Sequence, residues 1–191
     1  MSNVIVALAS APIKSALQII RLSGDGVFEM TDNVFSKKIS NIKEKTIFFG
    51  KISNKKEIID VVMLYAYPAP HTFTGEDVVE ITCHGSVLIA NDIIQAYLDQ
   101  GATYATRGEF TSRAFYNGKT DLIEAEAVND LINATTRESK KLSLLSLQGK
   151  TSKLVEPLKE SIAKLLSLIE VNIDYPEYED IRSEEHTSEL Q

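Results

Sequence analysis

The hydrophobic pattern of the chain changes type at Gly118, and this change constrains the fold more than any other feature. Before Gly118, short β-branched and aliphatic runs are separated by Gly, Pro and Ser, which is typical of strands. After it, apolar residues recur at the three- and four-residue spacing of amphipathic helices. The sequence therefore predicts an α+β fold: an N-terminal mixed β-sheet domain with helices over residues 1–118, then the first helices of an α-helical domain over residues 119–181.

Individual elements follow from the same patterns. Asp121 and Glu124 have the spacing of a capping box, which starts a helix there. Pro157 lies inside a long helical pattern, so we expect a kink or break near Val155. We expect strands over residues 4–8, 17–22, 46–52, 58–67 and 77–83, and helices over residues 27–35, from Ser86 to a Gly101 stop, after 119 and over 137–173.

The C-terminal part of the chain looks incomplete. Two amphipathic helices cannot bury their apolar stripe alone, so they need the first domain, a second copy of the chain, or residues beyond Ile181. Residues 182–191 lack any periodicity and match the translation of a common sequencing adapter. We expect residues 182–191 to be an adapter artefact and the natural chain to be truncated after Ile181. The alternative is a polar, disordered terminus.

Composition excludes several classes of protein. Cys83 is the only cysteine, and no Cys/His spacing fits a metal, so we expect neither a disulfide nor a metal site. No apolar run approaches the roughly 18 residues of a membrane span, and we expect a cytoplasmic protein without membrane contact. The net charge of −7 disfavours a generic nucleic-acid surface, which needs clustered Lys and Arg.

Arg21 interrupts an apolar strand in the segment Gln18-Ile19-Ile20-Arg21-Leu22-Ser23-Gly24. Its planar guanidinium suits a carboxylate partner. The alternative is an arginine on an edge strand that points to solvent.

Glu80 lies in the block of residues 73–85, where three carboxylates precede His84 and Gly85. Strand alternation places the side chains of Glu80 and Val79 on opposite faces of the sheet. Glu80 therefore either points into a cleft above the sheet or lies on a solvated face. A carboxylate in a cleft suits paired N–H donors, such as those of a pterin. His84 precedes a helix start and is either structural or an anion ligand.

Lys119 follows a turn predicted at Asn117-Gly118, in a stretch where basic and aromatic residues interleave. Its ammonium can reach a carboxylate or formyl oxygen of a ligand. The alternative is that the stretch only ends one helix and starts the next. Neither type of glycine-rich nucleotide-binding loop occurs in the chain, so we do not expect these 191 residues to hydrolyse GTP.

Five blocks in order resemble the MnmE (TrmE) family of bacterial tRNA modification GTPases, over residues 4–181. They are Ile20-Arg21-Leu22-Ser23-Gly24, residues 73–85, residues 107–115, residues 117–122 and Ser146-Leu147-Gln148-Gly149. The resemblance implies an N-terminal domain that binds 5-formyltetrahydrofolate or a related reduced folate and is similar in fold to aminomethyltransferases. The family positions that contact the folate fall on Arg21, Glu80 and Lys119, and no catalytic residue is implied here.

The resemblance also implies the role of the parent protein. With a flavin-dependent partner, MnmG (GidA), the family adds an aminomethyl or carboxymethylaminomethyl group to carbon 5 of the wobble uridine of tRNA. Family members form homodimers through the N-terminal domain. Their GTPase domain, with its GTP, Mg²⁺ and K⁺ sites, is inserted into the helical domain, so the enzyme activity belongs to the parent and not to this fragment. Two alternatives remain open: a stand-alone folate-dependent aminomethyltransferase-like protein, and a non-catalytic dimerisation module.

Overall fold

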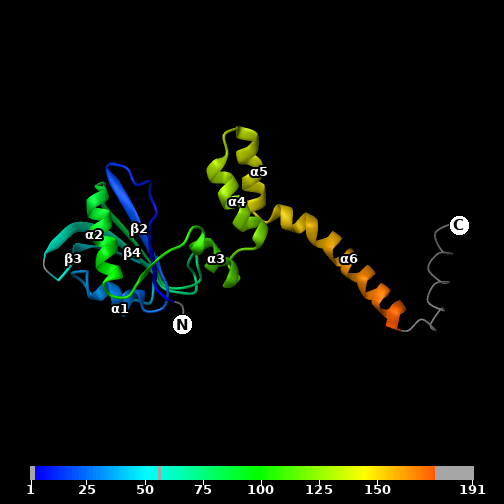
Figure 1. Ribbon diagram of the computed structural model, residues 1–191, viewed down its shortest axis with the longest axis horizontal. Coiled ribbons are helices and arrows are strands. Elements are labelled where there is room, and N and C mark those ends of the chain that lie inside the picture. Colours follow the sequence, from blue (N-terminus) through cyan, green and yellow to red (C-terminus); the bar gives the residue numbers. More distant parts are fainter. Residues whose placement is uncertain (1–2, 56, 175–191) are drawn as a thin grey trace. The chain divides into compact units, whose positions relative to one another are not determined.

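The computed structural model describes residues 3–55 and 57–174 (Figure 1). The chain divides into two compact units between Ala125 and Glu126, which we call the sheet unit and the helical unit and describe separately. The mixture of one sheet with helices confirms the predicted α+β class. The domain bounds expected from the sequence stay a prediction, and the adapter-like residues 182–191 lie outside the described residues.

The sheet unit contains a six-stranded mixed sheet with the order β3-β4-β5-β2-β1-β6. All neighbours pair antiparallel except β1 and β6, which are parallel. The five strands predicted from the sequence are confirmed, whereas the short β6 was not predicted. The strands are β1 (Ile5–Leu8), β2 (Leu17–Ser23), β3 (Thr46–Ser53), β4 (Ile58–Tyr67), β5 (Val78–His84) and β6 (Thr103–Tyr104).

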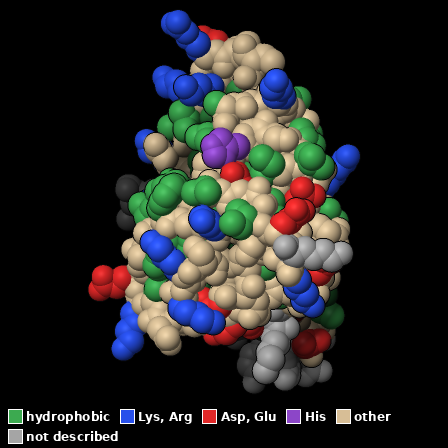
Figure 2. All heavy atoms as spheres, turned by 90° about the vertical axis from the view of Figure 1, so that its left-hand side faces the viewer, with side chains coloured by type: hydrophobic (Ala, Val, Ile, Leu, Met, Phe, Trp, Pro, Cys, Tyr) green, Lys and Arg blue, Asp and Glu red, His purple; other side chains and the backbone are tan. Residues whose placement is uncertain are grey.

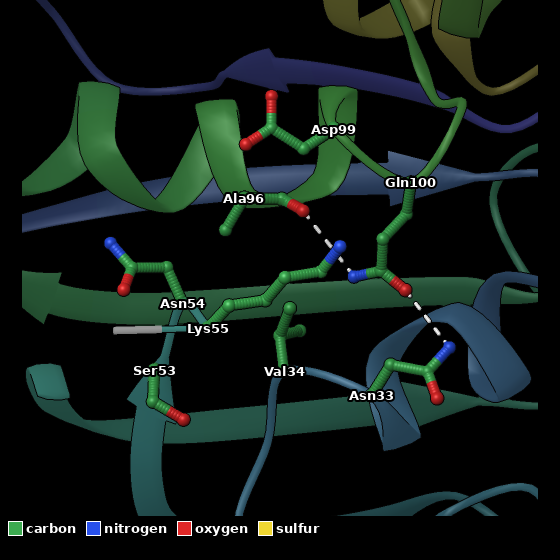
Figure 3. A pocket seen from close by; sticks show the side chains of 8 residues that line it. All are labelled: Asn33, Val34, Ser53, Asn54, Lys55, Ala96, Asp99 and Gln100. Atoms are coloured by element: carbon green, nitrogen blue, oxygen red, sulfur yellow. Dashed lines mark hydrogen bonds between the residues drawn. The ribbon is translucent and has the colours of Figure 1, made fainter. Parts of the chain in front are cut away.

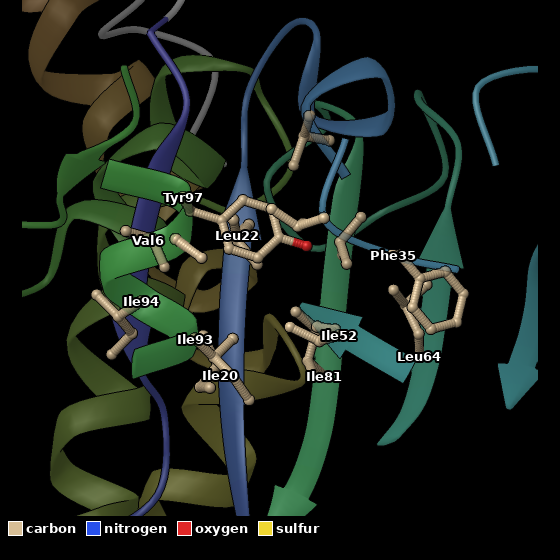
Figure 4. Packing of buried hydrophobic residues seen from close by; sticks show 14 of the residues in the cluster. Val6, Ile20, Leu22, Phe35, Ile52, Leu64, Ile81, Ile93, Ile94 and Tyr97 are labelled. Carbon is tan, nitrogen blue, oxygen red and sulfur yellow. The ribbon is translucent and has the colours of Figure 1, made fainter. Parts of the chain in front are cut away.

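One face of the sheet is covered by α2 (Val87–Leu98), with α1 (Val27–Asp32) beside it. Figure 4 shows side chains of α2 packed on alternate residues of the strands. Burying these side chains is the main favourable term in the stability of the unit. The fully buried members include Val6, Ile20, Leu22, Ile52, Leu64, Ile81, Ile93 and Tyr97.

The helices of the sheet unit differ in detail from the sequence expectation. Helix α1 ends at Asp32, three residues earlier than predicted. Ser86 precedes α2 as predicted, but its side chain makes no capping hydrogen bond. The helix α3 (Glu109–Tyr116) was not predicted, because its apolar positions are too few to give a clear helical period.

The opposite face of the sheet is not covered by α1 or α2, and α3 reaches it only beside Arg21, through Phe110; we call it the open face. Register places Arg21 beside Glu80, and Glu80 beside Tyr65, on this face. Five exposed apolar side chains share it: Leu17, Ile19, Ile47, Phe49 and Val61. Exposed hydrophobic side chains also gather on the face of the molecule drawn in Figure 2.

The helical unit contains the end of α4 (Leu122–Asn133), then α5 (Arg137–Leu147) and α6 (Lys150–Asp174). At the start of α4, Asp121 and Glu124 each accept a hydrogen bond from the other's backbone N–H, which confirms the predicted capping box. Of the kink or break expected near Val155, the break is wrong, because α6 runs through Pro157 without interruption. The interruption lies at Gly149, whose φ of 69° ends α5.

Helix α6 has no buried residue in the described part of the chain. Its apolar side chains, among them Leu158, Leu165 and Ile169, are exposed. This agrees with the expectation that the helical stripe needs a further packing partner. None of the described helices is both long enough and apolar enough to span a bilayer.

Candidate functional site

An ion pair between Arg21 and Glu80 lies on the open face, at the middle of the sheet. The Nε and Nη2 atoms of Arg21 each lie 2.7 Å from Oε1 of Glu80. The edge-strand alternative for Arg21 is wrong, because β2 is an interior strand between β5 and β1. Glu80 and Val79 lie on opposite faces, as strand alternation predicted, and Glu80 lines a cavity on its face.

Two aromatic rings flank the guanidinium of Arg21. Its Cζ atom lies 5.7 Å from the ring centroid of Phe73 and 5.8 Å from that of Phe110. Phe73 comes from the loop before β5, and Phe110 from α3. Cation–π attraction to both rings favours this position of the guanidinium. The ion pair is therefore preorganised by three separate segments.

A cavity of about 310 Å³ opens beside this pair. Its lining combines aromatic, basic and acidic groups: Arg21, Lys45, Tyr67, His71, Phe73 and Glu80. Burial, together with the negative charge of Glu80, raises the pKa of Tyr67, so its hydroxyl remains a neutral hydrogen-bonding group. The volume falls at the lower end of the roughly 300–1,000 Å³ typical of small-molecule sites.

A buried polar network fixes the loop that carries Phe73. Arg113 of α3 bridges two carboxylates: its Nη1 lies 3.1 Å from Oε2 of Glu76, and its Nη2 lies 2.9 Å from Oε1 of Glu109. The Ser23 hydroxyl donates to the same Glu76 oxygen at 2.7 Å and lies 2.7 Å from the Thr74 hydroxyl. The network ties β2, the loop and α3 together, and so sets the distance between the two rings around Arg21.

Lys119 lies next to this loop, but it is not joined to the ion pair. A Cβ atom added at Gly75 would lie 2.9 Å from Cε of Lys119, so the lysine stem passes directly over Gly75. Gly118 has a φ of 65°, which confirms the predicted turn. Within residues 3–55 and 57–174, no hydrogen bond or ion pair links Lys119 to Arg21 or Glu80. Lys119 is exposed.

His84 pairs with a carboxylate of the chain itself, in place of the bound anion that was one of its two predicted roles. Its Nδ1 lies 2.8 Å from Oδ1 of Asp60 on β4. Burial alone would raise the pKa of Asp60, but hydrogen bonds from the His84 backbone N–H and ring outweigh it and hold that pKa below its ordinary value. His84 therefore has a structural partner across the strands.

A second cavity, of about 740 Å³, lies on the helix-covered side where α1 and α2 end (Figure 3). Asn33 donates to Gln100, and Gln100 donates to the Ala96 carbonyl. Figure 3 shows the Lys55 side chain extending across the cavity toward the end of α2. Among the described residues, its lining holds no aromatic ring and no ion pair of the Arg21–Glu80 kind, so the smaller cavity is the better candidate.

Sequence reasoning missed four residues of the candidate site: Lys45, Tyr67, His71 and Phe110. Tyr67 could have been found, because it is the last residue of a predicted strand and its face could be read from strand alternation, as that of Glu80 was. Lys45 precedes a strand and Phe110 belongs to an unpredicted helix, so only the three-dimensional arrangement brings them to the site.

Residues 4–119 match the family model described as the N-terminus of the GTP-binding protein TrmE, and residues 122–191 match the MnmE helical domain. The tRNA modification GTPase MnmE of Mycoplasmopsis pulmonis is 42% identical over 188 residues, covering 98% of this chain and 42% of that protein. The MnmE of Ligilactobacillus salivarius is 44% identical over 184 residues, covering 95% of this chain and 40% of the relative. The chain thus spans about two fifths of the length of these curated relatives.

Proposed function

Because the chain belongs to the MnmE (TrmE) family of tRNA modification GTPases, we propose that its sheet unit binds a reduced folate for that modification reaction. The proposed ligand is 5-formyltetrahydrofolate or a close relative, and the proposed site is the cavity beside Arg21 and Glu80. The observation that carries the proposal is an acidic and a basic group held together on the wall of a cavity between aromatic rings. When bound, the folate supplies a one-carbon unit.

The residues of the cavity fit a pterin ring. Arg21 uses only Oε1 of Glu80, which leaves Oε2 able to accept N–H donors from a ligand. The ring of Phe73 provides an apolar wall for a flat bicycle. Lys119 completes the proposed set: its exposed ammonium, on a stem that crosses Gly75, is free to turn toward a formyl or carboxylate oxygen.

The parent protein is proposed to act as the family does. We place the GTP, Mg²⁺ and K⁺ sites in parts of the parent outside these 191 residues, since the chain contains no glycine-rich nucleotide loop. The flavoprotein MnmG (GidA) and tRNA are the proposed partner and substrate of the assembly, in the cytoplasm. In this proposal the chain contributes binding and orientation of the folate rather than a catalytic residue.

Replacing Glu80 with alanine tests the folate proposal. We expect calorimetric titration of the 191-residue chain with 5-formyltetrahydrofolate to give saturable heat, and Glu80→Ala to weaken binding by about 10- to 100-fold. This is the loss expected when charge-assisted hydrogen bonds are removed. Glu29→Ala, with the same charge change on α1, is the matched control and should bind normally. Unchanged affinity in Glu80→Ala, or no binding by folded wild-type chain, would refute the proposal.

The open face supports a second element of the proposal, a homodimer through the sheet unit. Phe49 on the edge strand β3 is 61% exposed, and Ile47 beside it on the same face is 60% exposed. Exposed apolar side chains on an edge strand and its neighbours are costly in water unless another surface covers them. A second copy of the same face would cover them with matching apolar side chains.

Introducing a charge into this face tests the dimer. We expect the wild-type chain to sediment as a dimer and Phe49→Glu to sediment as a monomer, because the carboxylate would be buried without a partner. Leu88→Glu is the control, since Leu88 is similarly exposed but lies on α2, which covers the other face. A dimer that persists in Phe49→Glu would place the association elsewhere, such as on the apolar side of α6.

A further inference from the structure

Two basic side chains of the cavity have no partner within the described part of the chain. Lys45 and His71 both line the cavity that contains Arg21 and Glu80. Both are exposed, and no hydrogen bond or ion pair within residues 3–55 and 57–174 engages either of them. Neither residue was identified from the sequence.

The charges around the cavity do not cancel. Glu80 is the only acidic residue among the described residues of the lining, and its charge is matched by Arg21 at 2.7 Å. Lys45 therefore adds an unbalanced positive charge, and His71 adds an N–H donor in either protonation state. In a chain with a net charge of −7, a local positive surplus beside a cavity favours a ligand that carries an anionic group.

The positive charge of Lys45 lies at a distance from the Arg21–Glu80 pair. Lys45 immediately precedes β3, while Glu80 lies on β5, with β4 between them. Two strand separations amount to roughly 10 Å across the sheet. One ligand that reaches both residues must therefore be elongated, with a hydrogen-bonding edge at one end and an anionic group farther along.

We propose that Lys45, assisted by His71, binds the carboxylate tail of the ligand whose ring edge is held at Glu80. The inference rests on the proposed folate function and extends it to residues that determine specificity for a tailed ligand. Since Lys45 is exposed, its pairing with a carboxylate is a surface interaction of modest strength. The lysine thus selects between tailed and tail-free ligands more than it supplies total affinity.

Comparing two ligands separates this inference from the folate proposal itself. The probes are tetrahydrofolate and 6-methyltetrahydropterin, which has the reduced ring without the glutamate tail. We expect Lys45→Ala to weaken tetrahydrofolate binding by about fivefold, the factor that corresponds to roughly 1 kcal/mol, and to leave 6-methyltetrahydropterin binding unchanged. Lys45→Arg should restore tetrahydrofolate binding, and the wild-type preference should shrink as salt is raised.

Lys51→Ala is the matched control, since Lys51 is an exposed lysine on β3 that does not line the cavity. Equal weakening of both ligands by Lys45→Ala, or no effect on either, would overturn the tail assignment while the folate proposal stands. Loss of both ligands in Glu80→Ala alone would support the ring site independently. If the folded wild-type chain binds neither probe, the folate proposal and the tail assignment are both refuted.

Discussion

Replacing Arg113 with alanine is expected to lower the free energy of unfolding of the sheet unit by about 3 kcal/mol. Arg113 is 15% exposed and bridges Glu76, which is 10% exposed, and Glu109. Its removal leaves two poorly solvated carboxylates without their cation, a change that typically costs about 3–5 kcal/mol. The residual exposure of both partners places the expected loss at the lower end of that range.

The buried thiol of Cys83 provides the measurement for this prediction. Cys83 is the only cysteine and lies in the sheet unit, so its labelling in increasing urea reports unfolding of that unit alone. Arg107→Ala is the matched control, because Arg107 is an exposed arginine just before α3. Arg113→Lys should fall between wild type and alanine, because an ammonium lacks the fork that serves two carboxylates. A loss no larger than that of Arg107→Ala would show that the network contributes little.

The same substitution has a consequence for the candidate site. Phe73 and Phe110 reach Arg21 from two segments that the Arg113 network joins. Loosening the network is expected to let the rings separate and the cavity widen. The network therefore connects the stability of the loop to the geometry of the proposed ligand site.

Much of the fold followed from the sequence, because strand alternation and helix periodicity are local signals. The face occupied by Glu80 could be predicted from its neighbours Val79 and Ile81 alone. Its pairing with Arg21 could not, because the register between β2 and β5 joins residues 59 positions apart. The same holds for Phe110, whose ring reaches Arg21 only when α3 is placed against the loop.

The error in the helical unit has a physical explanation. Pro157 removes one backbone donor, and this was expected to kink or break the helix. The surrounding residues have strong helical preferences, and α6 continues through the proline. At Gly149 the backbone adopts a left-handed conformation that other residues avoid, so the chain turns there instead. Gly149 was therefore a better predictor of the helix end than Pro157.

Cys83 is expected to react with thiol reagents at least about a hundredfold more slowly in the native chain than in urea at pH 8. Its side chain is 1% exposed, on the face of β5 that packs under α2. Burial, with the charge of Asp60 adding to it, raises the pKa of the thiol to about 11. At pH 8 roughly one thiol in a thousand is then ionised in the native chain, against roughly one in four in the unfolded chain, and only the thiolate attacks the reagent.

The pH dependence of labelling distinguishes a raised pKa from simple inaccessibility. A free thiol such as glutathione levels off above its pKa of about 8.5, whereas the native rate should still rise between pH 9 and 10. The folded state holds the proton of Cys83 more tightly than the unfolded state. Stability from this group is therefore complete below about pH 8.5 and declines as the pH approaches 11. A native rate close to that of glutathione would mean that β5 is not covered by α2, and would contradict the core on which the candidate site rests.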